Sequence, residues 1–382
     1  MNKTTQVILG IIIVVVVVAL IVYGVTKADQ AATPDSTEPI KIGWLGPLTG
    51  DVSSIGQNAK AATEIAVAEI NEAGGINGRP IKVIYEDSSC DGKAAANAAS
   101  KLLNIDQVSI IWGGACSGET SAFVKSAMEQ KKIVMTYCSS APNLSQSGEF
   151  FFRVYPSDNF QAKFAAEFAY NSLGKRKAAI LYTQSDWGTG LKQVFEKKFP
   201  ELGGEIVKVE SMQQKDKDMR TQLTKIKEAN PDLLYMPAYT EETKNAVRQV
   251  HELGLDLQVL GGDAWDDPSI WEDAGLAGEG VMYTIPYSPI SDHYKQAMKD
   301  KTGSDDILIC APGAYDVPYL TTQAMKAVGT DPEKIKDYLH SMPAYTNGVV
   351  TSSIEFDANG DIKEANYMVK IIKDSKMVEY TK

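Results

Sequence analysis

The spacing of hydrophobic positions changes repeatedly along this chain, and each change marks a structural element. From residue 40 to residue 260, short β-branched or otherwise apolar runs alternate with longer segments whose apolar residues recur at helical spacing. The short runs predict strands at residues 40–45, 80–86, 108–112, 133–136, 178–182, 205–209, 233–236 and 258–260. The longer segments predict helices at residues 57–73, 92–103, 118–130, 161–172, 188–198, 219–229 and 241–253. This alternation is typical of α/β proteins, whose parallel sheets are covered by helices on both faces.

The first apolar run does not fit this alternation. Residues 7–25 carry no charge and are long enough to span a bilayer, whereas the apolar core of a cleaved signal peptide has about 7–15 residues. We therefore expect a transmembrane anchor at 7–25, with Lys3 and the rest of segment 1–6 in the cytoplasm and the remaining chain outside. A cleaved signal, which would leave a periplasmic or secreted protein, is the alternative. Residues 26–39, rich in small residues, Pro and Ser/Thr, predict a flexible stalk.

Length and charge narrow the class further. The 382 residues favour two domains, because single hydrophobic cores rarely grow beyond roughly 250–300 residues. Lys and Arg total 38 against 49 Asp and Glu, a net charge of −11, and no basic run would complement a phosphate backbone. We therefore expect no nucleic-acid partner.

No metal site or other cofactor is expected. The three histidines, His251, His293 and His340, are far apart and have no cysteine or histidine at ligand spacing. Residues 357–361, DANGD, look briefly like a calcium-binding loop, but no Glu follows at the twelfth position. We expect a hairpin turn there instead.

The loops after the predicted strands carry the unusual residues. Open parallel sheets bind ligands outside the carboxyl ends of their strands, so these loops are the candidate site. Their sequences are GPLTGDVSSIG, EDSSCDG, GGACSGET, YCSSAPN, TQSDWGTG, PAYTEET and GGDAWDDP. Small hydroxyl residues, glycines at helix starts, a carboxylate and two tryptophans indicate a cleft for a small molecule, and no catalytic constellation is evident.

Several of these segments together resemble a known family. AEINEAGGINGRP at residues 68–80, followed by VIYEDSSCDG, GGACSGET, FFRVYPSD and LYTQSDWGTG, is similar to the extracellular solute-binding proteins of branched-chain amino acid ABC transporters, of the leucine/isoleucine/valine-binding type. The resemblance runs from about residue 40 to the carboxyl end. It implies the type I periplasmic binding protein fold, with two doubly wound lobes and a ligand in the cleft between them.

The same resemblance implies where the chain passes between the lobes. Three crossings are expected near residues 153–157, 284–288 and 351–354. The first lobe would then comprise 40–155 and 287–352, and the second lobe 156–286 and 353–382.

The resemblance also implies which residues hold a ligand carboxylate. These are Ser117 in GGACSGET and Ser140 in YCSSAPN, with Ser139 and the Cys138 carbonyl beside them. A carboxylate at helix amino ends meets free N–H groups and a favourable dipole, and hydroxyl groups add short donors. Plain helix capping by the same serines is the alternative.

A ligand ammonium needs an anion once water leaves the cleft, and Asp263 in GGDAW matches the acidic position of the family. Helix capping is again the alternative for this residue. Tyr239 and Trp187 fall where the family places aromatic residues against the ligand, and Ile55 stands where some relatives have an aromatic residue. Trp265 is either a further wall of the cleft or a buried core residue.

The four cysteines divide into two groups. Cys90 and Cys116 match the disulfide of the amino-acid-binding relatives, and an outward-facing domain permits that bond. Cys138 and Cys310 are left over, and either a second disulfide or two free thiols is possible. A catalytic cysteine is disfavoured because no histidine accompanies either residue.

The sequence therefore predicts the extracytoplasmic substrate-binding component of an ABC importer. It would capture an α-amino acid, branched-chain or otherwise aliphatic, by clamshell closure, and a membrane permease would recognise the closed form. The alternative is a sensor for amino acids, amides or small carboxylates that passes closure to a signalling partner. An enzyme that uses Ser117 or Cys138 would lack a base.

Overall fold

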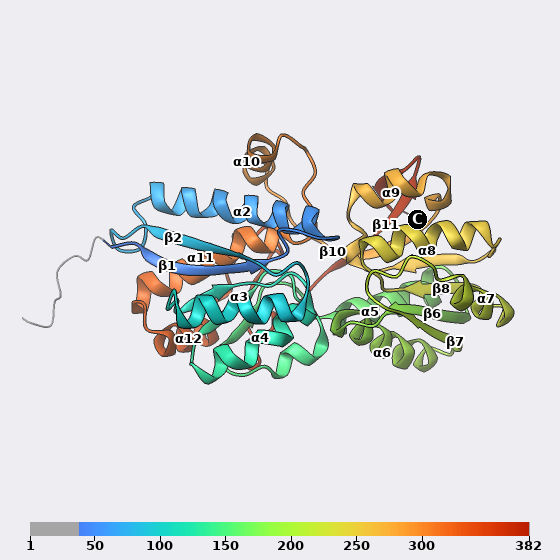
Figure 1. Ribbon diagram of the computed structural model, residues 1–382, viewed down its shortest axis with the longest axis horizontal. Coiled ribbons are helices and arrows are strands. Elements are labelled where there is room, and N and C mark those ends of the chain that lie inside the picture. Colours follow the sequence, from blue (N-terminus) through green and yellow to red (C-terminus); the bar gives the residue numbers. More distant parts are fainter. Residues whose placement is uncertain (1–37, 382) are drawn as a thin grey trace, which may run out of the picture.

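Two sheets organise the protein, and the computed structural model describes residues 38–381. Figure 1 shows them side by side, each between two layers of helices. We name the part around the five-stranded sheet the first lobe and the part around the seven-stranded sheet the second lobe. The expected transmembrane segment 7–25 lies outside the described residues, and within 38–381 no helix has the length and apolar character needed to cross a membrane.

The first lobe contains a parallel sheet in the order β2-β1-β3-β4-β5. Its strands are β1 (Ile40–Gly46), β2 (Ile81–Asp87), β3 (Ile110–Trp112), β4 (Ile133–Thr136) and β5 (Phe151–Arg153). One face is covered by α2 (Ser53–Glu72), α11 (Ala311–Val328) and α12 (Pro332–Ser341), and the other by α3 (Gly92–Asn104) and α4 (Ser117–Glu129). Helix α10 (Asp292–Thr302) lies against the outer side of α2.

The second lobe contains seven strands in the order β12-β11-β10-β9-β8-β6-β7. They are β6 (Lys177–Thr183), β7 (Glu205–Met212), β8 (Leu233–Met236), β9 (Gln258–Gly261), β10 (Met282–Pro286), β11 (Tyr367–Lys373) and β12 (Lys376–Glu379). Helices α5 (Asp158–Glu167) and α6 (Asp186–Glu201) cover one face, and α7 (Arg220–Glu228), α8 (Thr240–Glu252) and α9 (Pro268–Ala274) cover the other.

The central strands are apolar because both of their faces are buried. All residues of β4 and β8 are buried, as expected for parallel strands between two helix layers. Helices begin at capping side chains after these strands: Asp91 accepts from the Ala94 amide at α3, and Ser185 accepts from the Gly188 amide at α6. The eight predicted strands and seven predicted helices are thus confirmed, with ends that differ by a few residues.

The second sheet is not wholly parallel, which corrects the expectation from the alternating pattern. Strands β11 and β12 run antiparallel to their neighbours, with β10 paired to β11 and β11 paired to β12. The β11–β12 connection turns at Asp374 and Ser375, both with positive φ, which allows a tight hairpin. Two antiparallel strands can be joined by a short hairpin without a crossover helix. The alternation of strand and helix patterns in the sequence therefore does not predict this pair.

The carboxyl-terminal passage between the lobes also differs from the expectation. Segment 357–361 forms the predicted hairpin turn, flanked by an antiparallel bridge between Phe356 and Ile362. Asp361 pairs with Arg153 at the end of β5, where Arg153 Nε donates to Asp361 Oδ1 at 2.6 Å. Residues 354–362 therefore pack on the first sheet, although residues from 353 onward were expected in the second lobe.

Candidate ligand-binding site

A small pocket lies between the two lobes, at the carboxyl ends of strands from both sheets. Seven of the eight residues predicted to bind a ligand line this pocket, which are Ile55, Ser117, Cys138, Ser140, Trp187, Tyr239 and Asp263. The centre of a water molecule can move through about 40 Å³ of it. Since a single water occupies roughly 10–15 Å³ on this measure, the closed pocket has room for a compact ligand.

Ser117 is the first residue of α4 and lies at the first-lobe side of the pocket. Its hydroxyl oxygen accepts hydrogen bonds from the amides of Ser140 and Ala141, at 3.2 and 3.0 Å. With its oxygen occupied in this way, the hydroxyl hydrogen is available to donate to a guest in the pocket. The loop after β4 is thereby held against the amino end of α4.

Ser139 is the one predicted contact that does not line the pocket. Its hydroxyl lies within 2.7 Å of the Thr120 hydroxyl and donates to the Gly114 carbonyl at 3.0 Å. Consecutive residues of an extended loop point in opposite directions, so Cys138 and Ser140 face the pocket while Ser139 faces the protein interior. Ser139 thus joins two loops of the first lobe.

The second lobe contributes an aromatic wall. Trp187 lies in the first turn of α6 and Tyr239 directly before α8, and their rings stack with centroids 4.9 Å apart. Both residues are buried and both line the pocket. Trp265 does not line it: its indole N–H donates to the Ala238 carbonyl at 3.0 Å, and its ring packs on Trp271, so the core alternative is correct.

Asp263 supplies the carboxylate of the site. It begins the short 3-10 helix η4 (Asp263–Trp265) directly after β9, and only 3% of its surface is exposed. The Tyr155 hydroxyl donates to Asp263 Oδ2 at 2.7 Å. Burial raises the pKa of Asp263, since no cation within residues 38–381 forms an ion pair with it. A positively charged ligand group would stabilise the ionised form of this buried carboxylate.

Both candidate disulfides are formed, and each has a cysteine lining the pocket. Cys90 pairs with Cys116, as the family resemblance implied, and Cys138 pairs with Cys310, which settles the open alternative. Cys310 immediately precedes α11, so the second bond joins the loop after β4 to a helix far along the chain.

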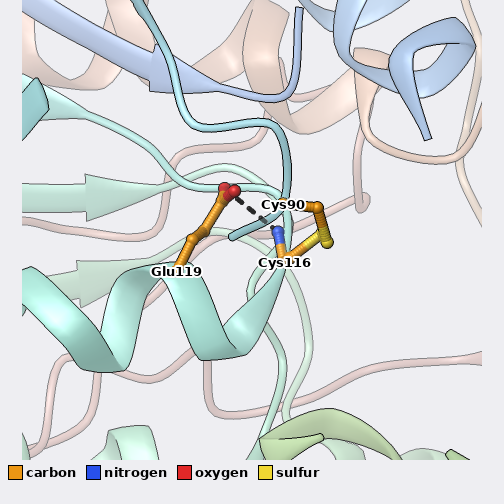
Figure 2. A group of neighbouring side chains, drawn as sticks. All are labelled: Cys90, Cys116 and Glu119. Carbon is orange, nitrogen blue, oxygen red and sulfur yellow. Dashed lines mark hydrogen bonds between the residues drawn. A yellow bond between two sulfur atoms is a disulfide. The ribbon is translucent and has the colours of Figure 1, made fainter. Parts of the chain in front are cut away.

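Glu119 supports the loop that carries Cys116 and Ser117. Figure 2 shows its carboxylate, from the first turn of α4, directed back to the Cys116 amide, which donates at 3.1 Å. The Ser88 hydroxyl donates to the other oxygen. Burial raises the pKa of Glu119 to about 7. Within residues 38–381, Cys90, Cys116 and Glu119 are also the one group close enough to hold a metal ion, but their two sulfurs are used in the disulfide.

Several pocket residues were not singled out from the sequence. Ile309 comes from the segment before α11, and Tyr155, which does not line the pocket but donates to Asp263, comes from the first passage between the lobes. Val52 and Pro47 come from the loop after β1. Position in a loop directly after a strand was the sequence signal for pocket residues. This signal could have identified Pro47 and Val52 in the loop after β1, but not Ile309, which follows no strand.

A larger, more open groove lies elsewhere, between α2 and α11 on the first lobe. It has a volume of about 1030 Å³ and includes Glu69, but that carboxylate is already paired. His293 Nε2 lies 2.7 Å from one oxygen, and the Tyr315 hydroxyl donates to the other at 2.6 Å. The carboxylate of the groove is therefore already engaged, and the small pocket, which brings together groups of both lobes, is the better candidate despite its size.

Contacts between the lobes surround the pocket. The Ser54 hydroxyl donates to Asp267 Oδ2 at 2.7 Å, and the Asn143 amide donates to Asp186 at 3.3 Å. These bonds join α2 of the first lobe to the start of α9, and the loop after β4 to the start of α6. The protein is therefore in a closed arrangement.

Two α/β lobes that close on a small pocket define a clamshell solute-binding protein. The chain belongs to the periplasmic binding protein family, whose sequence pattern matches residues 39–376. The resemblance found in the sequence is thus confirmed, together with the type I fold.

Three relatives illustrate the similarity. The leucine-, isoleucine-, valine-, threonine- and alanine-binding protein of Pseudomonas aeruginosa is 28% identical over 356 residues, 92% of this chain and 93% of that protein. A leucine-binding protein from Thermotoga maritima is 28% identical with a TM-score of 0.82, covering 90% of this chain and 98% of that one. A branched-chain amino acid transporter substrate-binding protein from Streptococcus pneumoniae, in complex with isoleucine, is 25% identical with a TM-score of 0.80. The match covers 90% of this chain and 100% of that one.

The same fold also occurs with other ligands. A solute-binding protein from R. palustris in complex with benzoate has a TM-score of 0.79 at 20% identity, and covers 89% of this chain and 95% of that one. At this identity the likeness concerns the fold alone. The ligand of this chain must therefore be argued from its own pocket.

Proposed function

We propose that this protein is the extracytoplasmic substrate-binding component of an ABC importer and that it captures an α-amino acid by closure of its two lobes. One observation carries the proposal: a single pocket holds hydroxyl and amide groups of the first lobe opposite a buried carboxylate of the second. A free α-amino acid carries the complementary pair of charges. Its binding needs no catalytic group.

The carboxylate of the amino acid would lie at the amino end of α4. Ser117 donates its hydroxyl hydrogen there, and the first amides of the helix add partial positive charge. Ser140, beside Ser117 in the same pocket, adds a second hydroxyl. Hydrogen bonds to a charged group are worth roughly 1.5–3 kcal/mol each, so two hydroxyl groups and a helix end suffice to fix this group.

The ammonium would face Asp263. The carboxylate is almost fully buried and accepts from Tyr155, which leaves its other oxygen for the ligand. The stacked rings of Trp187 and Tyr239 exclude water from this side. Because Asp263 has no cation partner in the described part of the chain, the ligand ammonium would be the group that forms an ion pair with this buried carboxylate.

The side chain of the ligand would be compact and aliphatic. Val52, Ile55 and Ile309 line the pocket together with both disulfides, and the free volume is small. The names of the relatives include leucine, isoleucine, valine and alanine, whose side chains are of this kind, together with threonine, which is compact but carries a hydroxyl group. Benzoate, the ligand of a more distant structural relative, has a carboxylate but nothing to pair with Asp263.

Calorimetric titration of residues 39–382 with the twenty amino acids, benzoate and urea tests this proposal. We expect binding of aliphatic L-amino acids and no measurable binding of benzoate or urea. Tight binding of benzoate with no binding of any amino acid would contradict the assignment of Asp263 as the ammonium partner. Heat from urea alone would favour an amide ligand instead.

We further propose that segment 7–25 anchors the protein to the cell membrane, where a permease would recognise the closed form. The support is the uncharged apolar length of this segment and the positive charge before it. We expect the intact protein to sediment with membranes in cell fractionation. A soluble protein that begins near residue 28 would show that the segment is a cleaved signal.

A further inference from the structure

A second buried carboxylate, that of Asp158, lies next to the proposed ammonium site. Asp158 is the first residue of α5, just after the first passage between the lobes, and is fully buried. Its amide donates to the Ser140 carbonyl at 2.9 Å, which ties it to the pocket loop. Neither of its carboxylate oxygens has a hydrogen-bond partner among residues 38–381. The site described above does not use this group.

No cation is available to balance Asp158. Arg153 is the positive group that acts on it, but the guanidinium is already committed to another carboxylate. Arg153 Nε donates to one oxygen of Asp361 at 2.6 Å, and Nη2 donates to the other at 2.9 Å. Asp158 and Asp263 are therefore two neighbouring buried carboxyl groups without an ion pair in the described part of the chain.

Hydroxyl groups, rather than charges, complete the surroundings of Asp158. The groups that face or act on it are the Ser140 hydroxyl, Asp263 from η4, Arg153 and Tyr155 from β5 and the passage after it, Tyr235 from β8, Tyr239 before α8 and Tyr367 from β11. The hydroxyls of Tyr235 and Tyr367 are buried and have no partner among the described residues. A neutral carboxylic acid, which both donates and accepts, suits such polar and uncharged neighbours better than a carboxylate does.

We propose that Asp158 takes up one proton from solvent when the lobes close on an amino acid, and that it is held as a neutral carboxylic acid in the complex. The inference rests on the proposed function. An α-amino acid brings one ammonium, and Asp263 pairs with it. A second ionised carboxylate would remain buried and unpaired, and neutralisation removes that cost. Burial and the neighbouring charge of Asp263 both raise the pKa of Asp158 well above its usual range.

Proton uptake makes amino acid affinity depend on pH with a definite sign. The pKa of Asp158 is higher in the closed complex than in an open, hydrated cleft, so the complex binds more protons. Affinity then falls as pH rises between these two pKa values, by up to about tenfold per pH unit. An ion pair alone, with Asp263 ionised throughout, would leave affinity constant in this range.

The test is calorimetric titration of the full-length protein with L-valine at pH 7, in buffers of different ionisation enthalpy. We expect the parent to take up about one proton per valine. Asp158→Asn mimics the neutral acid, so it should bind valine within a few-fold of the parent, with no proton uptake. Asp292→Asn, at the same first helical position of α10 but exposed, is the matched control and should behave as the parent.

Three results would overturn the proposal. They are no proton uptake by the parent, uptake that persists in Asp158→Asn, and a large loss of affinity at all pH values in that variant. Preferential binding of L-lysine with no proton uptake would show instead that Asp158 is an ionised partner for a second ammonium. If Asp158→Asn does not fold, infrared difference spectra of the parent decide: valine should create a carboxylic acid C=O band.

A ligand-free comparison separates this inference from the proposed function. If the parent binds no amino acid, the proposed function fails by itself. Urea unfolding of parent and Asp158→Asn without ligand still reports on the buried carboxyl. We expect the two ligand-free proteins to show the same pH dependence of stability from pH 6 to 8, because Asp158 is ionised both in the open, hydrated cleft and in the unfolded chain. A loss of stability in the parent relative to Asp158→Asn over this range would show that Asp158 is already neutral before binding, and would refute proton uptake on closure.

Discussion

At the scale of single residues, Asp263 is the group on which the proposed choice of ligand depends. It is buried at the end of β9, accepts from Tyr155, and has no cation partner among the described residues. A zwitterion therefore matches this site better than a simple carboxylate does. The identity of the residue was visible in the sequence, but its bond to Tyr155 was not, since Tyr155 lies more than a hundred positions earlier.

We expect Asp263→Asn to weaken amino acid binding by roughly 2–5 kcal/mol, because it leaves the ligand ammonium unpaired in a buried site. The amide keeps the shape, so the loss should come from charge. Ser139→Ala, which removes a hydroxyl that does not line the pocket, should cost binding much less. Exposed Asp273→Asn is the charge control. Parent-like affinity of Asp263→Asn in a calorimetric titration would remove this residue from the site.

A second prediction at this scale concerns Asp316, whose carboxylate accepts from the amides of Val349 and Val350, each at 2.8 Å. Burial raises its pKa to about 7 from the ordinary 3.8. The folded state thus binds the proton more tightly, and the associated stability is lost as pH rises through 7. Between pH 5 and 8 this amounts to roughly 2–3 kcal/mol.

Asp316→Asn keeps an acceptor for both amides, so it should flatten this pH dependence without unfolding the protein. Urea unfolding at pH 5 and pH 8 measures the difference. Asp337 is exposed, so Asp337→Asn should leave the change of unfolding free energy with pH the same as in the parent. A slope in Asp316→Asn equal to that of the parent would show that other buried acids account for the pH dependence.

At the scale of elements, the sequence predicted the strands and helices up to residue 260 because buried parallel strands are uniformly apolar. It did not predict β5, which has three residues, or the antiparallel β11 and β12, whose partly exposed faces mix polar and apolar residues. The candidate pocket lies where the sequence predicted a site, since strand ends converge at one edge. The direction of a loop side chain such as Ser139 was not, because neighbouring residues face opposite ways.

The two disulfides give a prediction at the same scale. Their cysteines are separated by 26 and 172 residues. On the chain-entropy account, replacing Cys90 and Cys116 by Ser should cost roughly 3–4 kcal/mol of unfolding free energy, and replacing Cys138 and Cys310 roughly 5 kcal/mol. Urea unfolding of the two double variants measures which one loses more unfolding free energy. A larger loss from the Cys90–Cys116 variant would contradict this prediction.

At the scale of the whole molecule, the two lobes meet around one pocket. Contacts such as Ser54 to Asp267 cross between them and can form only in the closed arrangement. Each lobe has its own sheet between two layers of helices, which is the arrangement that hinge closure requires. A ligand that touches Ser117 on one lobe and Asp263 on the other supplies the free energy that favours closure.

Small-angle X-ray scattering of residues 39–382, without ligand and at saturating L-valine, tests this closure most directly. We predict that the radius of gyration falls on addition of valine, and that it does not fall in Asp263→Asn at the same concentration. A radius of gyration that stays the same while calorimetry shows the parent saturated with valine would contradict capture by lobe closure.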